Sequence, residues 1–243
     1  MFANRPLYCR LRKPNRYPAN PPPAELFLST MPRRSIRALQ AKVNLQSVLR
    51  EVDDLPSQLT SQTLFGNDQP LEIEVGSGKG LFMQTVSGDQ PETNFLGIEI
   101  ARKYAVSAAA RLASGARKNA LMVPGNAEPL FKDRVPTASL AGVHVYFPDP
   151  WWKARHKSRR VLNETSIRNF SRCLQAGGRF HFWTDVLDYF ESTIELIAVV
   201  APELGPPIPE EAAKAEHDLD YRTHFERRSR QHAIPVYRVC YTK

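Results

Sequence analysis

Three carboxylates stand at positions where a protein can act on a bound ligand. Glu74 comes two positions before the first glycine of Glu-Val-Gly-Ser-Gly-Lys-Gly (74–80), Glu99 lies near the end of the next apolar run, and Asp149 stands between two prolines. Glycines let the backbone turn sharply and approach a ligand closely. An acid beside them repels a pyrophosphate and attracts a cationic group, and a carboxylate after a second strand can hold both hydroxyls of a ribose. Together they predict a site for a nucleoside-like ligand with a cationic end.

The glycine spacing excludes two common nucleotide-binding loops. A dinucleotide fingerprint, G-x-G-x-x-G, would need a third glycine where this chain has Leu81, and the phosphate-binding motif G-x-x-x-x-G-K-[ST] does not occur. The spacing found here, with Gly76 and Gly78 after Glu74 and with Glu99 on the following strand, resembles that of S-adenosylmethionine-dependent methyltransferases. Any turn from a strand to a helix also favours glycines, so the pairing with Glu99 decides the interpretation.

Two tryptophans and a run of cations follow Asp149. The stretch 153–160 holds five Lys or Arg residues and one His, and no acid. A solvated face normally mixes charge signs, and a turn with core tryptophans would account for Trp151 alone. Cations beside aromatic rings, at the mouth of a nucleoside site, predict a nucleic acid that presents one base. Pro148 and Pro150 stiffen the loop that carries the carboxylate.

The net charge of +8 is concentrated at the start of the chain. Residues 1–43 hold nine Lys or Arg residues and one acid, whereas the rest of the chain is balanced. We expect residues 1–60 to form a basic, proline-rich and partly disordered arm with one candidate helix near 33–51, and residues 61–243 to form the folded domain. Such an arm could serve solubility alone, but the concentration of the whole charge favours a polyanionic partner.

Cysteine use and hydropathy limit the class of protein. Cys9, Cys173 and Cys240 are odd in number, far apart and without a metal-ligand spacing, so we expect neither a disulfide framework nor a metal site. No apolar run reaches the ~18–20 residues of a membrane span, and the N-terminus lacks an apolar signal core. The sequence predicts a cytoplasmic protein with no membrane partner.

Alternating strands and helices must position these residues. Short apolar runs predict the strands, and apolar residues at helical spacing predict the helices. The expected strands are 71–75, 94–100, 120–123, 142–147 and 179–184, and the expected helices are 80–88, 101–114, 127–132, 163–175 and 186–200. This alternation predicts an α/β fold, with a parallel sheet and helices on both faces. The last two segments, 221–230 and 234–243, look like an antiparallel pair.

Three motifs carry a resemblance to a known family. They are Y-F-P-D-P-W-x-K-x-R-H-x-x-R-R (146–160), F-x-x-x-T-D ending at Asp185, and Thr223-His-Phe-Glu226, which matches T-x-[FY]-E. They are similar to the motifs of the tRNA (guanine-N7)-methyltransferases, and the resemblance covers roughly 65–243. It implies a Rossmann-like class I methyltransferase with a mostly parallel seven-stranded sheet and an antiparallel C-terminal hairpin. It also implies methyl transfer from S-adenosylmethionine to N7 of guanine 46 in the tRNA variable loop.

The resemblance further implies roles for single residues. The cofactor would be bound by Glu74, Gly76, Gly78, Glu99, Asn126 and Asp149. The substrate guanosine would be contacted by Lys153, Asp185, Thr223 and Glu226, and the substrate tRNA also by Arg155, His156 and Arg159. Asn126 departs from the family, which usually has Asp there, although an amide can still accept from an adenine amino group. Trp152 also replaces a smaller or more polar residue. Bacterial members work without a second subunit, so no obligatory protein partner is expected, and both a monomer and a homodimer stay open.

The reaction can be argued from its target atom. Guanine N7 has an in-plane lone pair and no proton to lose, so it needs neither a strong base nor a covalent enzyme intermediate. The site must align N7, methyl carbon and sulfur, and must place a carboxylate near the charge that arrives on the purine. Asp149 is the predicted catalytic residue. Asp185 and Glu226 could accept from the guanine edge, but Asp185 could equally cap a helix, and Thr223 and Glu226 could be a surface hairpin pair.

Two other interpretations stay open. The stretch Asp-Pro-Trp-Trp (149–152) faintly resembles the Asp-Pro-Pro-aromatic motif of exocyclic-amine methyltransferases, which would make adenine N6 or guanine N2 the target. Alternatively, a non-catalytic RNA-binding protein could keep the same fold. The presence of Glu74, Glu99 and Asp149 argues against that second alternative.

Overall fold

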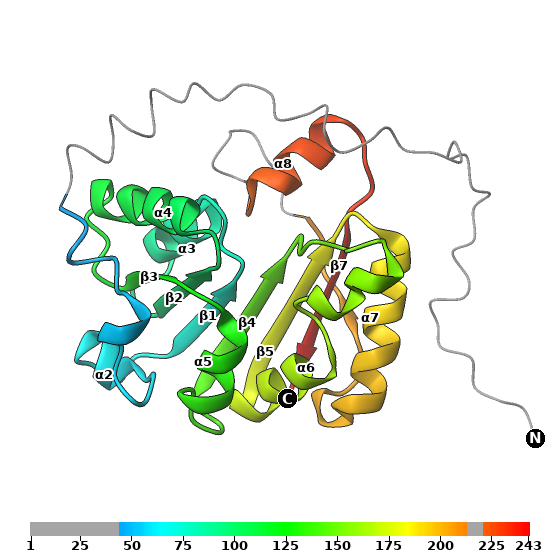
Figure 1. Cartoon of the computed structure of the whole chain (residues 1–243), viewed down its shortest axis with the longest axis horizontal. Helices are drawn as coiled ribbons and strands as arrows, with labels where there is room; N and C mark the ends of the chain where they lie inside the picture. The colour runs from blue at the N-terminus through cyan, green and yellow to red at the C-terminus, as the bar shows by residue number, and fades with distance from the viewer. Residues whose placement is uncertain (1–43, 213–220) are drawn as a thin grey trace, which may run out of the picture.

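Seven strands form one sheet in the order β3-β2-β1-β4-β5-β7-β6 in this computed structural model (Figure 1). The structure describes residues 44–212 and 221–243. The strands are β1 (Leu71–Val75), β2 (Asn94–Glu99), β3 (Ala120–Pro124), β4 (Leu140–Tyr146), β5 (Leu174–Thr184), β6 (Ile208–Pro209) and β7 (Tyr237–Thr242). β1 to β5 run parallel, whereas β7 is antiparallel to β5 and β6. The predicted fold class is confirmed, including its antiparallel C-terminal end.

Helices cover both faces of the sheet, as predicted. One apolar cluster joins the sheet to α5, α6 and α7, which lie side by side in front of β4 and β5 in Figure 1, and a second joins it to α3 and α4. At the start of α6, Asn163 and Ser166 each accept from the other's backbone N–H, a capping box that fixes where the helix begins. The α-helices are α2 (Ser61–Phe65), α3 (Leu81–Asp89), α4 (Arg102–Ser114), α5 (Ala127–Asp133), α6 (Glu164–Cys173), α7 (Leu187–Val200) and α8 (His224–Gln231). The 3-10 turns are η3 (Val52–Asp54), η4 (Ala154–Arg159) and η5 (Pro202–Leu204).

The two faces of the central strands differ in chemistry, because side chains alternate along a strand. The face toward α5, α6 and α7 is apolar, with Ile73, Val143, Val145, Phe180, Phe182, Val239 and Tyr241 in its cluster. The opposite face carries the buried side chains of Glu72, His144 and His181. His144 pairs with His181 in the β4–β5 register, and His181 pairs with Cys240 in the β5–β7 register. A row of polar side chains therefore crosses the sheet.

The prediction of a strand over 221–230 is wrong, because residues His224–Gln231 form the helix α8. The Thr223 hydroxyl accepts from the backbone N–H of Glu226 at 2.9 Å, which satisfies a donor that the first helical turn leaves free. The antiparallel neighbours of β7 are instead β5 and the short β6. In Figure 1, α8 lies beyond the carboxyl ends of the parallel strands.

Residues 44–60 belong to the range expected to form the arm, and they pack on the sheet. The Met122 N–H on β3 donates to the Val48 carbonyl at 2.7 Å, and the Arg50 N–H donates back to the Met122 carbonyl at 3.0 Å. Val48 and Leu59 are buried in the core. Residues 1–43, with most of the candidate helix at 33–51, lie outside the described residues, so the order of the arm stays a prediction. Within the described part of the chain, no helix has the length and apolar character needed to cross a membrane.

Candidate functional site

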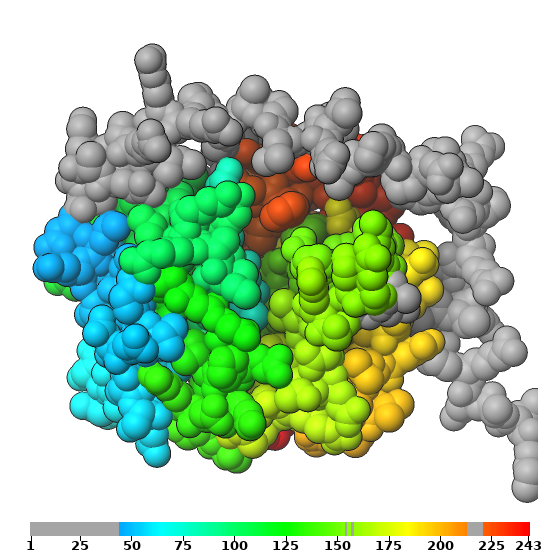
Figure 2. All heavy atoms as spheres, in the orientation of Figure 1, coloured from blue at the N-terminus to red at the C-terminus, as the bar shows by residue number. Residues whose placement is uncertain are grey.

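A cavity of about 530 Å³ opens at the carboxyl ends of β1 and β4, under α8. Figure 2 shows the orange atoms of α8 at this end, between α4 and the yellow-green segment that follows β4. The loop after β1 and the last residues of β4 form one wall, and α8 forms the other. The residues that line it are Glu74, Gly76, Ser77, Gly78, Lys79, Leu81, Phe82, Tyr104, Tyr146, Phe147, Thr223, His224, Phe225, Arg227, Arg228, Gln231 and His232.

The glycines of the loop after β1 serve two purposes: Gly76 and Gly78 leave space for a ligand, and Gly80 allows two helices to pack closely. Gly76, Gly78 and Gly80 all have positive φ angles, 81°, 52° and 73°, which side chains with a Cβ rarely adopt. A Cβ on Gly80 would lie 2.4 Å from that of Ala108, so this glycine lets α3 approach α4. A Cβ on Gly76 or Gly78 would meet nothing within 4 Å. These two glycines therefore leave open space on the cavity side.

Glu74 is the buried carboxyl of the cavity. Its side chain is 3% exposed, and one carboxylate oxygen, Oε2, has no hydrogen-bond partner among the described residues. Burial, with a smaller contribution from the charge of Glu99, raises the pKa of Glu74 to about 8. A buried carboxyl without a partner is costly, and a cationic ligand would relieve that cost. Glu74 therefore lies at the cavity, where a cationic ligand would favour its ionised form.

Glu99 and Asn126 hold backbone groups at the next two strand ends. The two oxygens of Glu99 accept from the N–H groups of Gly78 and Ala101, each at 2.8 Å, so Glu99 fastens the glycine loop to β2. Asn126 caps α5 by accepting from the Glu128 N–H at 3.1 Å. Neither residue is part of the cavity lining given above. Their direct contact with the cofactor stays a prediction.

Asp149 lies on a strained loop at the end of β4. Phe147 and Trp151, on either side of Pro-Asp-Pro, have φ angles of 50° and 45°, which are uncommon for residues other than glycine. Arg160 donates to the Pro150 carbonyl at 2.8 Å and stacks on the Tyr189 ring at 4.5 Å, which ties the loop down. Asp149 itself is exposed and lies outside the cavity lining. Its catalytic role stays a prediction.

The predicted tRNA-binding cations lie on η4 and just before it. Lys153, Arg155 and Arg159 are exposed, and His156 is half-buried with its ring edge-on to Trp151, 5.7 Å between centroids. The Arg159 guanidinium lies over the same ring at 5.2 Å. Trp151 thus organises the cations around it, beyond the simple core role that could be argued from sequence.

Thr223 lines the cavity, whereas Glu226, which belongs to α8, and Asp185 do not. Glu226 is 2% exposed, and its oxygens accept from the Arg222 N–H at 2.8 Å and from the Arg238 guanidinium at 3.2 Å. Asp185 accepts from the Ser229 hydroxyl at 3.4 Å. The helix that follows Asp185, α7, begins after Val186 without a side-chain cap, so Asp185 is not its cap. The interpretation of Thr223 and Glu226 as a surface hairpin pair is also wrong.

Sequence reasoning missed most of the α8 side of the cavity. The Phe225 ring, 56% exposed, lies parallel to the Phe147 ring at 6.0 Å, and Arg227 and Arg228 line the same wall. A signal was present, because Thr-x-x-Glu is the capping-box spacing of a helix start, although the apolar run that usually follows it is missing here. Reading the segment as a strand hid that signal.

One group of potential metal ligands occurs among the described residues. His181, Glu210 and Cys240 offer ligand atoms within 4.8 Å of one another, on the polar side of the sheet. Glu210 already accepts from His181 at 2.9 Å and from the Trp183 indole at 2.6 Å. The group is therefore a hydrogen-bonded cluster, separate from the cavity lining.

Comparisons with known proteins agree on one family. The family model described as "Putative methyltransferase" matches residues 68–239. The chain is 63% identical over 221 residues to a protein of Rhodopirellula baltica named tRNA (guanine-N(7)-)-methyltransferase, covering 89% of this chain and 82% of that protein. A protein of the same name from Listeria innocua is 30% identical over 185 residues, covering 73% of this chain and 82% of that protein.

Two solved structures share the fold. The crystal structure of the aminoglycoside resistance methyltransferase NpmB1 has a TM-score of 0.50 at 20% identity and covers 76% of this chain and 94% of that one. An antibiotic-related methyltransferase has a TM-score of 0.51 at 15% identity, with 76% and 95% covered. At such identities the likeness shows the fold alone.

Proposed function

Because the chain belongs to the family of tRNA (guanine-N(7)-)-methyltransferases, we propose that it transfers a methyl group from S-adenosylmethionine to N7 of guanine 46 in the tRNA variable loop. The observation that carries this proposal is the cavity under α8, where the unpartnered carboxylate oxygen of Glu74 stands beside the open glycine loop. Exposed cations after β4 and the arginines of α8 suit a polyanionic substrate.

The residues around the glycine loop fit this cofactor. Glu74 would take its ammonium group, and the space beside Gly76 and Gly78 admits a ligand against the backbone. Each oxygen of Glu99 accepts one backbone N–H and keeps a lone pair for a ribose hydroxyl. Asn126, at the start of α5, would face the adenine. When bound, S-adenosylmethionine supplies a methyl group activated by a positively charged sulfur.

Asp149 is the proposed catalytic residue. The purine gains positive charge as N7 is alkylated, and a fixed carboxylate stabilises that charge without having to reorganise. The prolines and the Arg160 contact to Pro150 hold the loop in place before the substrate arrives. No proton leaves N7, so Asp149 would act by charge and orientation and not as a base.

The substrate-binding residues divide into two groups. Arg155, His156 and Arg159 would contact tRNA phosphates, and Lys153, Thr223 and Asp185 would orient the guanosine. Since the proposed substrate is tRNA, we propose a cytoplasmic location. The proposal needs no second kind of subunit, and a monomer and a homodimer both satisfy it.

Incubation of the purified protein with radiolabelled S-adenosylmethionine and unmodified tRNA transcripts tests this function. Digestion to nucleosides should give label in 7-methylguanosine, and borohydride reduction followed by aniline should cleave the product strand at that nucleotide. Label in an adenine N6 or guanine N2 product would support the exocyclic-amine alternative. Binding of tRNA without any labelled product, together with no heat of binding for the cofactor, would support a non-catalytic RNA-binding protein.

A further inference from the structure

α8 lacks the apolar packing that normally holds a helix in place. Among its eight residues, only Glu226 and Ser229 are buried, and both are polar. A helix of this length is marginal on its own in water. Apart from the stacking of Phe225 on Phe147, the contacts that join α8 to the sheet are therefore polar.

The first of these contacts joins α8 to β7. Glu226 is 2% exposed and accepts from the Arg238 guanidinium, whose side chain is 10% exposed and lies over the Trp183 ring at 4.9 Å. Arg230, one turn later on α8, lies 3.5 Å from the same carboxylate oxygen. The other oxygen accepts from the Arg222 N–H. The carboxylate thus points to the sheet and bridges the start of α8, its last turn and β7.

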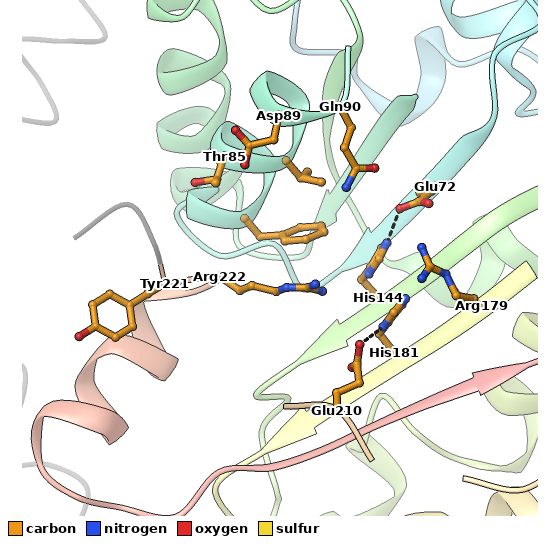
Figure 3. A pocket seen from close by; sticks show the side chains of 12 residues that line it. Glu72, Thr85, Asp89, Gln90, His144, Arg179, His181, Glu210, Tyr221 and Arg222 are labelled. Atoms are coloured by element: carbon orange, nitrogen blue, oxygen red, sulfur yellow. Dashed lines mark hydrogen bonds and ion pairs between the residues drawn. The ribbon is translucent and has the colours of Figure 1, made fainter. Parts of the chain in front are cut away.

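The second contact is a chain of hydrogen bonds across the sheet, part of which Figure 3 shows. The Arg222 guanidinium donates to the Tyr146 hydroxyl at 2.7 Å, and this hydroxyl is 2.9 Å from His144 Nδ1. His144 Nε2 lies 2.7 Å from the Glu72 carboxylate. Burial lowers the pKa of His144 to about 4, so the imidazole is neutral and can accept from Tyr146 while donating to Glu72. In this arrangement the Tyr146 hydroxyl and the His144 Nε2–H each have one acceptor.

We propose that Glu226 and Arg222 are positioning residues, which hold α8 over the cofactor cavity from the sheet side and do not contact the guanosine. Both residues lie within 222–226, and their side chains bond to different strands. Glu226 accepts from Arg238 on β7, and Arg222 donates to Tyr146 on β4. The opposite side of α8, with Phe225, Arg228 and Gln231, lines the cavity. This inference rests on the proposed function for the meaning of the cavity, and it replaces the guanosine contact predicted for Glu226.

Arg238 separates a positioning role from a direct contact, because it pairs with Glu226 but does not line the cavity. We expect Glu226→Gln and Arg238→Met each to reduce kcat about 10-fold or more, and the double variant to be no slower than the slower single one, since coupled partners are not additive. Arg238→Lys should restore part of the loss. The Kd for S-adenosylmethionine should change less than kcat.

Hydrogen exchange gives a readout that does not depend on activity. In the full-length protein without ligand, the amides of 224–231 should exchange about 10-fold faster in Glu226→Gln, Arg238→Met and Tyr146→Phe, while those of β4 and β5 stay protected. Glu164→Gln is the matched control, because Glu164 forms an exposed ion pair with Arg168 at the start of α6, and it should change neither exchange nor turnover.

Normal α8 exchange and normal turnover in Arg238→Met, with turnover abolished in Glu226→Gln, would overturn the positioning role in favour of a direct contact. If Glu226→Gln does not fold, Arg238→Met and Tyr146→Phe carry the same exchange test. Failure of the wild-type protein to methylate tRNA would refute the proposed function, whereas the exchange result would still decide what holds α8.

Discussion

The two walls of the cavity are built in different ways. The β1–α3 wall is local: Glu74, Gly76, Gly78 and Gly80 lie within seven consecutive residues, and the neighbouring apolar strand and helix place them. The α8 wall is long-range, because α8 has no buried apolar residue and depends on partners from β4 and β7. The local wall suits the cofactor, which is the same small molecule in every reaction cycle. The α8 wall carries the arginines and the exposed aromatic ring that suit a large substrate, and small changes in its anchors can shift it.

The first prediction concerns the loop that follows β4, outside the lining of both walls, where we expect the greatest change in rate. Asp149→Ala should lower the single-turnover methylation rate by about two to three orders of magnitude, the scale of losing one electrostatic partner of a transition state. The affinity for S-adenosylmethionine should fall less than the rate. Asp133→Ala, another exposed carboxylate at the end of α5, is the control and should leave both unchanged. A wild-type rate in Asp149→Ala would make Asp149 a turn residue.

The second prediction isolates the local wall. Glu74→Gln should weaken S-adenosylmethionine binding roughly 10- to 100-fold, because the charged hydrogen bond to the ammonium group is removed. The pKa of Glu74 is raised to about 8 by burial, so the free protein holds this carboxyl mostly protonated at about pH 7. A cation favours the ionised form, and binding should therefore release a proton and weaken as the pH falls below about 8.

Calorimetry in two buffers with different ionisation enthalpies measures that proton. Release of up to one proton by the wild type at about pH 7, and no such release by Glu74→Gln, is the expected pair of results. Equal release from both proteins would place the titrating group elsewhere.

The third prediction concerns the effect of the Glu74 carboxyl on the pH dependence of the free energy of unfolding. A carboxyl whose pKa is higher in the folded state binds more protons when folded, so its contribution makes the free energy of unfolding fall as the pH rises from about 4.5 to about 8. Glu74→Gln should remove this contribution. The unfolding temperature of the variant minus that of the wild type should therefore increase as the pH rises across the same interval. Parallel curves for the two proteins would show that burial does not perturb Glu74.

The fourth prediction divides the cations between the cavity and the tRNA backbone. Lys153→Ala, close to Asp149, should mainly slow turnover of bound tRNA. Arg159→Ala, packed on Trp151, should mainly weaken binding and reduce the salt dependence of log K by about one unit. Single-turnover rates and binding at several salt concentrations separate the two effects. Identical single-turnover rates and identical salt dependence of binding for the two variants would contradict this difference in role.

The fifth prediction concerns the basic arm, whose removal should alter the chemistry least. Deletion of residues 1–43 removes the whole net charge and keeps the segment from Asn44 onward that packs on β3. Cofactor binding and turnover at saturating tRNA should change little. The salt slope for tRNA should shrink by about 0.7–0.9 for each phosphate that the arm neutralises in the full-length protein. Equal slopes before and after deletion would exclude the arm from tRNA binding.

The sequence predicted the local wall well and the α8 wall poorly, and the reason is physical. Apolar periodicity and glycines act over a few residues, so β1 to β5, their order of appearance and the Glu74 loop followed from them. α8 has few apolar residues to give a helical period, and its placement depends on Arg222 reaching Tyr146 and on Glu226 reaching Arg238. No local pattern encodes such pairings, although the Thr223–Glu226 spacing did signal a helix start.

The polar row on the sheet was visible in part. Glu72 and Glu74 alternate with apolar residues along 71–75, and His144 and Tyr146 alternate with valines along 143–146. This spacing puts polar side chains on one face of strands that are otherwise apolar. It was interpreted only as burial. That His144 and His181 pair across β4 and β5, with ring centroids 4.7 Å apart, depends on strand register, which the sequence left open.

Replacement of one atom in the substrate separates N7 from every other target on the base. A tRNA in which guanine 46 is replaced by 7-deazaguanine has a carbon in place of N7 and keeps both exocyclic positions. With labelled S-adenosylmethionine, we predict methylation of the unmodified tRNA and none of the 7-deaza tRNA, while both bind with similar affinity. Equal methyl incorporation into the two tRNAs would contradict attack by N7 at that position.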